Sequence, residues 1–161
     1  MKQLSEQEAL NKAAAYCTLC ERCTSEVSAK LSAWGMNSTQ SRRIIDFLID
    51  ENFIDEQRYC TAFANDKLRF NRWGRVKIAA ALREKRLPQS FIKEALEQID
   101  EKEYSDTLLA LINSKRKEIK APDDYTAAQK LLRFVAGRGF EPSLAMKLIK
   151  IGSADLTDAF D

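Results

Sequence analysis

Apolar residues recur along this chain in one register that returns about every fifty residues. Six positions of the first copy match six positions that lie 51 residues later. The first set is Val27, Leu31, Met36, Ile44, Ile45 and Leu48, and the second set is Ile78, Leu82, Leu87, Ala95, Leu96 and Ile99. A third copy follows with two more residues of offset at Leu131, Val135, Phe140, Leu148 and Ile149, and its last position is Gly152. Self-similarity at a fixed period predicts repeated units that pack against one another.

The spacing inside each copy is helical, because apolar residues three or four positions apart return to one face of a helix. Helix breakers are scarce, with five Gly and three Pro among 161 residues, and no strand-like alternation extends over any length. The sequence therefore predicts an all-α fold in which tandem three-helix repeats form an elongated, curved helical protein. The alternative is one irregular helical bundle whose similar spacings arise by chance.

The three-helix repeats are expected at residues 1–53, 54–101 and 102–152, followed by an acidic tail at residues 153–161. The opening helices are predicted at residues 6–18, 55–70 and 102–117. Ser5 and Glu8 have the spacing of a capping box for the first helix, and Asp55 is the candidate N-cap of the second.

Turns are predicted between the second and third helices of each repeat, at Gly35, Arg86 and Gly139. Gly35 is placed as a C-cap. Gly74 marks a different position, where either a turn or a close backbone approach requires a residue without a Cβ.

Positive charge is concentrated between Asp66 and Arg86, where eight basic and two acidic residues give +6, while the whole chain carries only +2. A second stretch, from Ser114 to Lys150, has nine basic and four acidic residues and a net charge of +5. Such stretches are often solvated helix faces. The functional alternative is a surface for an anionic partner, either nucleic acid or an acidic protein groove. Trp73 lies among the charges of the first stretch and favours this alternative, although its ring also suits a core.

The same stretch carries a pattern of residues typical of one family. Phe53-Ile54-Asp55-Glu56-x-Arg58-Tyr59 is followed by an aromatic residue at Phe63 and by Gly74-x-x-x-Ile78-x-x-x-Leu82-x-x-Lys85-x-x-Leu87. This pattern resembles the RecX family of RecA regulators. It covers the middle third of the chain closely, and the helical repeats on either side are similar more loosely. Many members have Gly where this chain has Arg86, a difference that concerns a helix C-terminus and not the charged surface.

The resemblance implies tandem three-helix repeats and a non-enzymatic regulator that binds the RecA–DNA filament. Members of the family lie along the filament groove and modulate, by inhibition above all, the recombinase, ATPase and coprotease activities of RecA. The chain would then act in homologous recombination, DNA repair and the SOS response. Its partners would be the RecA filament and, weakly and through charge, single- and double-stranded DNA.

On this hypothesis, basic residues of the second and third repeats contact phosphates or acidic side chains of the filament. The candidates are Lys67, Arg69, Arg72, Arg75, Lys77, Arg83, Lys130 and Arg133. Arginine suits bidentate contacts to either kind of anion. Arg58 is instead expected to be structural, paired with Asp55 one turn before it.

A second functional class is a sequence-independent DNA-binding helical protein without a protein target. Steep salt dependence on bare DNA is the expected mark of such a protein. The predicted third helices carry few base-reading side chains at consistent positions, which argues against sequence-specific readout.

Cys17, Cys20 and Cys23 form the one motif that suits inorganic chemistry, since three thiolates with a fourth ligand such as Cys60 can hold zinc or an iron–sulfur cluster. The residues between them include no turn formers, and reduced, packed thiols are the simpler interpretation. A metal protein would reveal itself by colour or by stoichiometric zinc. The chain has no His, which excludes Ser-His and Cys-His catalysis, and it has no Gly-rich phosphate loop. We therefore expect no enzymatic activity, no cofactor and no metal.

The sequence has no run of 18 apolar residues, and its first residues are too polar and acidic for a targeting segment. We expect a monomeric cytoplasmic protein without membrane contact.

Overall fold

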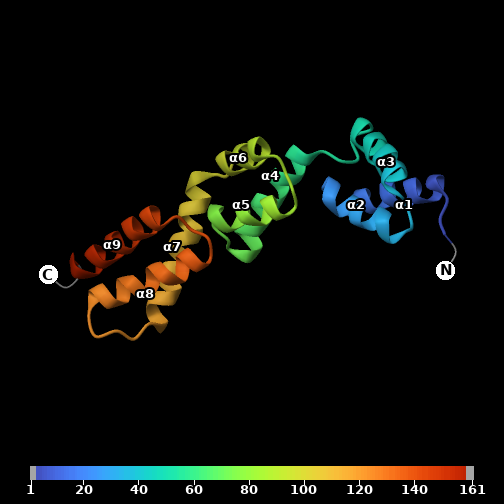
Figure 1. Cartoon of the computed structure of the whole chain (residues 1–161). Helices are drawn as coiled ribbons and strands as arrows, with labels where there is room; N and C mark the ends of the chain where they lie inside the picture. The colour runs from blue at the N-terminus through green and yellow to red at the C-terminus, as the bar shows by residue number, and fades with distance from the viewer. Residues whose placement is uncertain (1–2, 159–161) are drawn as a thin grey trace. The chain divides into compact units, whose positions relative to one another are not determined.

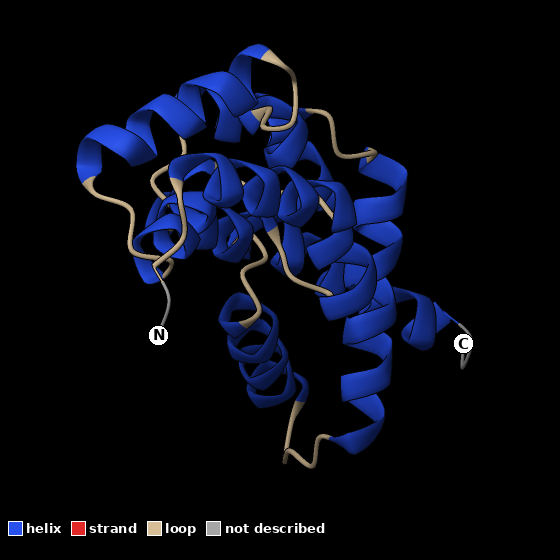
Figure 2. Ribbon diagram, turned by 90° about the vertical axis from the view of Figure 1, so that its right-hand side faces the viewer, coloured by secondary structure: helices blue, strands red, loops and turns tan. Residues whose placement is uncertain are grey.

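The computed structural model describes residues 3–158, and these residues form helices joined by turns, with no strand among them (Figure 2). The predicted all-α class is confirmed. In chain order the elements are α1 (Glu6–Leu19), α2 (Thr24–Ala33), α3 (Ser38–Asp50), α4 (Glu56–Asp66), the π-helix η1 (Lys67–Asn71), α5 (Arg75–Glu84), α6 (Gln89–Glu97), α7 (Glu101–Glu118), α8 (Asp124–Gly137) and α9 (Pro142–Asp158). Within the described residues, no helix combines the length and apolar character that a membrane crossing requires.

Side-chain caps fix where several helices begin. The Ser5 hydroxyl accepts a hydrogen bond from the Glu8 N–H at 3.1 Å, which is the serine half of the predicted capping box. Asp55 Oδ1 accepts from the Arg58 N–H at 3.0 Å, so Asp55 caps α4 as the sequence predicts. The expected starts of α1 and α4 therefore agree with the structure.

The second predicted opening helix differs from expectation in its last turn. The helix predicted at residues 55–70 is α-helical only to Asp66 and then widens into η1. A π-turn contains more residues than an α-turn, so α-helical spacing does not place the side chains of η1. Phe70 in η1 is 80% exposed, whereas Tyr59 in α4 is buried.

By its internal contacts the chain divides into two compact units, and their boundaries fall inside α4, α5 and α6. The first unit comprises residues 1–63 and 82–95, and the second comprises residues 64–81 and 96–161. The division into repeats at 1–53, 54–101 and 102–152 stays a prediction. Helix α9 continues to Asp158, into the predicted acidic tail, and residues 159–161 lie outside the described part.

In the first unit, α1, α2 and α3 pack around one apolar core (Figure 1). Its most completely buried members are Ala9, Ala13, Val27, Leu31, Ile44, Leu48 and Ile54. On α3, Ile44 and Leu48 are buried in this core, whereas Ile49 is 44% exposed.

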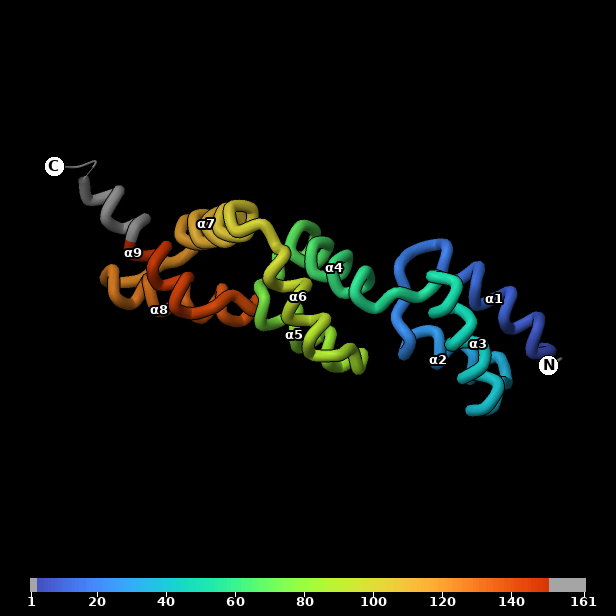
Figure 3. Tube along the Cα trace, turned by 90° about the horizontal axis from the view of Figure 1, so that it is seen from above, coloured from blue at the N-terminus to red at the C-terminus, as the bar shows by residue number. Residues whose placement is uncertain are grey.

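In the second unit, α7, α8 and α9 lie side by side (Figures 1 and 3). The core of this unit includes Tyr104, Leu108, Ile112, Leu131, Val135, Phe140, Ala145 and Ile149. The Tyr104 and Phe140 rings are in contact, with their centroids 5.2 Å apart.

The three turns that the sequence aligned share one backbone geometry. Gly35, Arg86 and Gly139 have φ angles of 88°, 62° and 93°, all in the left-handed region. The residue after each turn donates its N–H to the carbonyl five residues before it, at 3.0 Å for Met36, 3.3 Å for Leu87 and 3.1 Å for Phe140. This geometry closes a helix C-terminus and favours glycine, so Arg86 occupies a position where a side chain is strained.

Two glycines of the second unit bring backbone against backbone. A Cβ on Gly74 would lie 2.4 Å from the carbonyl carbon of Gly139, and a Cβ on Gly139 would lie 2.3 Å from the Lys77 Cβ. The Gly74 N–H donates to the Arg138 carbonyl at 2.8 Å, and the Val76 N–H donates to the Gly139 carbonyl at 2.9 Å. Of the two possibilities that the sequence left for Gly74, the structure shows the close backbone approach.

We expect Gly139→Ala to destabilise the protein by about 3 kcal/mol, because the added Cβ meets the Lys77 backbone and the left-handed φ is costly for alanine. Gly137→Ala is the matched control, since no heavy atom lies within 4 Å of its added Cβ. Gly137 is the last residue of α8, where this change should be neutral or stabilising by less than about 1 kcal/mol. Urea unfolding followed by circular dichroism measures both variants, and equal midpoints would contradict the proposed contact.

Candidate functional site

A tryptophan between two lysines marks the most basic surface of the second unit. The Lys67 Nζ lies 4.8 Å from the centre of the Trp73 ring, and the Lys77 Nζ lies 4.6 Å from it. Lys67 comes from the first position of η1 and Lys77 from the first turns of α5. Cation–π contacts of this kind fix the two ammonium groups near one indole.

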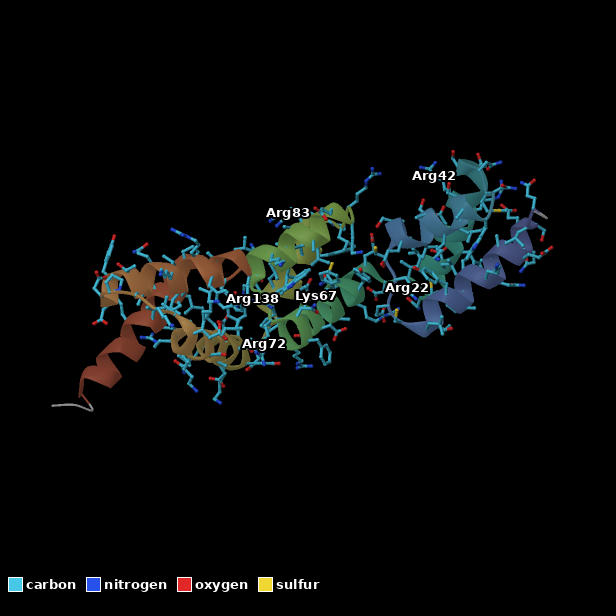
Figure 4. All side chains as sticks on the ribbon, turned by 90° about the horizontal axis from the view of Figure 1, so that it is seen from below. Arg22, Arg42, Lys67, Arg72, Arg83 and Arg138 are labelled. Atoms are coloured by element: carbon cyan, nitrogen blue, oxygen red, sulfur yellow. The ribbon has the colours of Figure 1, made fainter. Side chains whose placement is uncertain are left out.

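Two arginines extend this surface (Figure 4). Arg72 is exposed, and its left-handed backbone (φ 54°) ends η1. Arg138 donates from Nε to the Arg72 carbonyl at 3.2 Å and from its terminal nitrogen to the Asn71 carbonyl. Both acceptors are neutral carbonyl groups, so they do not compensate the positive charge of Arg138. The two hydrogen bonds hold the loop that contains Asn71 and Arg72. We call Lys67, Arg72, Trp73, Lys77 and Arg138 the Trp73 cluster.

Within the described residues, three of these cations, Arg72, Lys77 and Arg138, form no ion pair with a carboxylate. Their charges are therefore not compensated by a direct ion pair. A cationic surface of this kind suits phosphate or carboxylate partners.

Arg69, in contrast, is already paired. Its Nε lies 2.7 Å from Glu103 Oε1, and its Nη2 donates to Glu103 Oε2 at 3.3 Å. This contact lowers the pKa of the Glu103 carboxyl. The charge of Arg69 is thus compensated by an acid on α7.

Arg75 is the candidate whose position differs most from the expectation of an exposed contact. Its side chain is only 18% exposed and bonds Glu101 at 2.6 Å and Glu141 at 2.9 Å. The guanidinium carbon lies 3.9 Å from the centre of the Tyr104 ring. Arg75 therefore joins α5 and α7 to the turn before α9, because two carboxylates and one ring surround it.

Tyr104 completes this network. Its hydroxyl accepts from the Arg75 N–H at 3.0 Å and donates to Glu141 Oε1. Burial, together with the bond to Glu141, raises the pKa of the Tyr104 phenol above its usual range. The phenol consequently remains a neutral donor at physiological pH.

The other candidates are dispersed. Arg83 is exposed on the part of α5 that belongs to the first unit and bonds the Gln89 side chain at 3.1 Å. Lys130 and Arg133 are exposed on α8, and Lys130 donates to the Lys120 carbonyl at 2.9 Å. The structure thus brings Lys67, Arg72 and Lys77 together and leaves Arg83, Lys130 and Arg133 outside the Trp73 cluster.

A hollow of about 540 Å³ opens beside the cluster, but its lining has no net charge. It is lined by the basic Arg69, Arg72 and Lys102, the acidic Asp100, Glu103 and Asp106, and Thr107 and Ala110. Equal numbers of acids and bases do not favour an anion, so the exposed cations are the better candidate site.

The cysteines lie in different environments. Cys17, Cys23 and Cys60 are buried, and Cys20 is exposed. Cys23 is the N-cap of α2, and its N–H donates to Glu26 Oε1 at 3.1 Å. Among the residues that the structure describes, no group of three or more His, Cys, Asp or Glu side chains is placed to hold a metal ion.

Arg58 takes the structural role expected of it, but its main partner differs. Its Nη1 lies 3.9 Å from the predicted partner Asp55, whereas its Nε lies 2.5 Å from Glu21. The Glu21 contact joins α4 to the turn after α1, a long-range pairing that residue spacing does not reveal.

Comparison with known proteins identifies relatives of this chain. A family model described as "RecX, second three-helix domain" matches residues 55–96. The protein named Regulatory protein RecX from Clostridium botulinum (strain Eklund 17B / Type B) is 29% identical over 127 residues, which cover 78% of this chain and 59% of that protein. The chain thus spans little more than half the length of this relative. Regulatory protein RecX from Mycobacterium sp. (strain KMS) is 25% identical over 91% of this chain and 85% of its own length.

The fold is also shared with a solved structure. The crystal structure of RecX from Lactobacillus salivarius superposes with a TM-score of 0.79, at 19% identity, over 90% of this chain and 94% of that one. At this identity the match concerns the fold alone. The resemblance to the RecX family is confirmed by the family model, the named relatives and the shared fold together.

Sequence reasoning did not include Arg138 among the candidate site residues. Arg138 directly precedes Gly139 in the turn that the repeats share, and this position was the signal in the sequence that could have identified it. The carbonyls of Asn71 and Arg72 that it bonds lie more than sixty residues earlier, so spacing alone could not reveal the contact.

We expect Arg75→Ala to lower stability by about 2 kcal/mol, because it leaves the half-buried Glu141 without its cation and removes the contact to the Tyr104 ring. Arg69→Ala removes an equally short but exposed ion pair and should change the unfolding midpoint little. Thermal unfolding of the two variants tests the distinction. A larger loss in Arg69→Ala would mean that the assignment of structural and surface arginines is reversed.

The four thiols should react in two classes. Burial raises the pKa of Cys17 and Cys23 and raises that of Cys60 to about 11, so few of these groups are thiolates at neutral pH. We expect dithionitrobenzoate to label one thiol quickly in the folded protein and four in denaturant. Cys20→Ser should abolish the fast phase, and a fast phase that survives this change would contradict the burial of the other three.

Proposed function

We propose that this RecX-like chain is a non-enzymatic cytoplasmic regulator that binds the RecA–DNA filament and inhibits the recombinase, ATPase and coprotease activities of RecA. The observation that carries the proposal is the resemblance to proteins named Regulatory protein RecX, which extends over most of the chain. The structure supports it by offering a basic surface on the second unit, where Lys67 and Lys77 lie against Trp73.

The Trp73 cluster is the part of the second unit best suited to the filament contact. Arg72 and Lys77 form no ion pair with a carboxylate of the described residues, and Arg138 holds the loop that carries Arg72. Lys130, Arg133 and Arg83 are secondary contacts, since they are exposed and dispersed. Arg75 acts as a positioning residue for the cluster, and Arg69 contributes less because Glu103 compensates its charge.

The second candidate function is sequence-independent DNA binding without a protein target. The same observation favours it, because cations held beside an exposed loop also suit the phosphates of bare DNA. The two functions differ in stoichiometry: a filament regulator acts at few copies per RecA, whereas a competitor must cover the DNA.

The decisive measurement is the ATP hydrolysis of RecA on single-stranded DNA during titration with this protein below one copy per RecA. We expect hydrolysis to fall at these substoichiometric amounts. The variant Arg72→Glu/Lys77→Glu should lose most of the effect, because two cations of the contact become anions. Its matched control is Arg42→Glu/Lys147→Glu, which changes net charge equally at exposed positions outside the candidate set.

Each outcome assigns a function. A fall in hydrolysis that the Arg72/Lys77 variant loses and the control keeps supports filament regulation through the Trp73 cluster. A fall that appears only when the protein saturates the DNA assigns the second function. No fall at any ratio removes the filament assignment.

A further inference from the structure

A second arrangement of cations over aromatic rings lies in the first unit, between α1 and α2. The Lys12 Nζ from α1 lies 5.1 Å from the centre of the Trp34 ring at the end of α2. The Lys30 Nζ from α2 lies 5.5 Å from the centre of the Tyr16 ring on α1. Each helix therefore places its lysine on the aromatic residue of the other.

Arg22 completes this arrangement from the turn that joins the two helices (Figure 4). Its guanidinium carbon lies 3.8 Å from the centre of the Tyr16 ring, and its Nε donates to the Tyr16 carbonyl at 3.2 Å. One ring and one carbonyl thus orient the guanidinium, and its two terminal nitrogens remain available to an anion. We call Lys12, Tyr16, Arg22, Lys30 and Trp34 the α1–α2 seam.

The cations of the seam differ from several other cations of the first unit, because they have no acidic partner in an ion pair. Arg43 pairs with Glu6, Arg58 with Glu21 and Lys85 with Glu26, at 2.8, 2.5 and 3.4 Å. In the described part of the chain, Lys12, Arg22 and Lys30 take part in no ion pair with a carboxylate.

Two of the acids close to the seam in sequence are already engaged. Glu21 and Glu26 flank Arg22 and Lys30 along the chain, but they bond Arg58 and Lys85. The three seam cations therefore lie close together without a direct ion pair, while their aromatic neighbours limit their conformational freedom.

We propose that the α1–α2 seam binds the phosphate backbone of nucleic acid, as a contact separate from the Trp73 cluster. Lys12 and Tyr16 are one helical turn apart, as are Lys30 and Trp34, so the Lys12–Trp34 and Lys30–Tyr16 contacts lie one turn apart along the seam. Arg22 offers a planar pair of donors that fits a phosphate in bidentate fashion. A row of this kind follows a sugar–phosphate chain.

Nucleic acid fits the seam better than an acidic protein for two reasons. Phosphates along one strand form a regular row of charges, which matches cations supplied alternately by two helices. Cations also lie against both rings, so the rings orient charge. Binding through the seam is therefore independent of sequence and depends on salt.

The test is fluorescence anisotropy of a labelled oligothymidine titrated with the protein over a range of salt concentrations, in the absence of RecA. The seam variant is Lys12→Gln/Arg22→Gln/Lys30→Gln. With about 0.7 lost from the logarithmic salt slope per phosphate contact, we expect a slope shallower by about 2 and an affinity on the order of 100-fold lower at about 0.1 M salt.

The matched control removes three cations that are already in ion pairs, at Arg43, Lys102 and Lys115. This control variant should keep most of the salt dependence of oligonucleotide binding, because the charges that it removes are already compensated by carboxylates. Arg22 also bonds the backbone, so a second variant, Lys12→Gln/Lys30→Gln, leaves that bond intact and should still lower the slope by about 1. Circular dichroism and the unfolding midpoint show that each variant is folded.

A shallower slope in both seam variants and not in the control supports the proposal. An unchanged slope, or equal loss in seam and control variants, overturns it. Intact oligonucleotide binding together with a lost effect on RecA also overturns it and assigns the seam to a protein partner. Because the assay contains no RecA, failure of the proposed filament function leaves this test unaffected.

Discussion

The contact between Gly74 and Gly139 is the constraint on which the second unit depends. It brings the start of α5 so close to the turn after α8 that backbone carbonyls accept hydrogen bonds from the Gly74 and Val76 N–H groups. The Tyr104 hydroxyl accepts from the Arg75 N–H between them, so the donors at this helix start are satisfied. The same approach places Arg75 against Tyr104 and Glu141, and it brings Arg138 within reach of the loop at Arg72. The basic surface exists because this junction is closed.

The arginines of this unit show why charge in a sequence is an incomplete guide to function. Arg69, Arg72 and Arg75 lie within seven residues, yet each has a different environment. Arg69 is compensated by one acid on α7, Arg75 is largely enclosed by two acids and a ring, and Arg72 projects from a left-handed turn. Only an unpaired, exposed cation offers its full charge to a partner, since an ion pair must be broken before its charge can be used.

Much of the fold was predictable because it follows from local chemistry. The caps at Ser5 and Asp55, the turn at Gly35 and the need for glycine at position 74 all follow from backbone hydrogen bonding and sterics. The π-helical turn was not predictable, since helical spacing continues through Phe70 and only tertiary packing decides where an α-turn widens. The candidate site was harder to predict from the sequence than the fold. The partners of Arg75 and Arg138 lie 21 to 67 residues away, and no periodicity links them.

The Trp73 cluster and the α1–α2 seam are built on the same physical principle. In each, an aromatic ring holds two cations near one another. Repulsion between the cations opposes folding, and the attraction of each cation to the ring quadrupole offsets part of it. An arrangement that is costly in the isolated protein becomes favourable once an anion binds. Such sites are therefore better explained by a charged partner than by the stability of the fold.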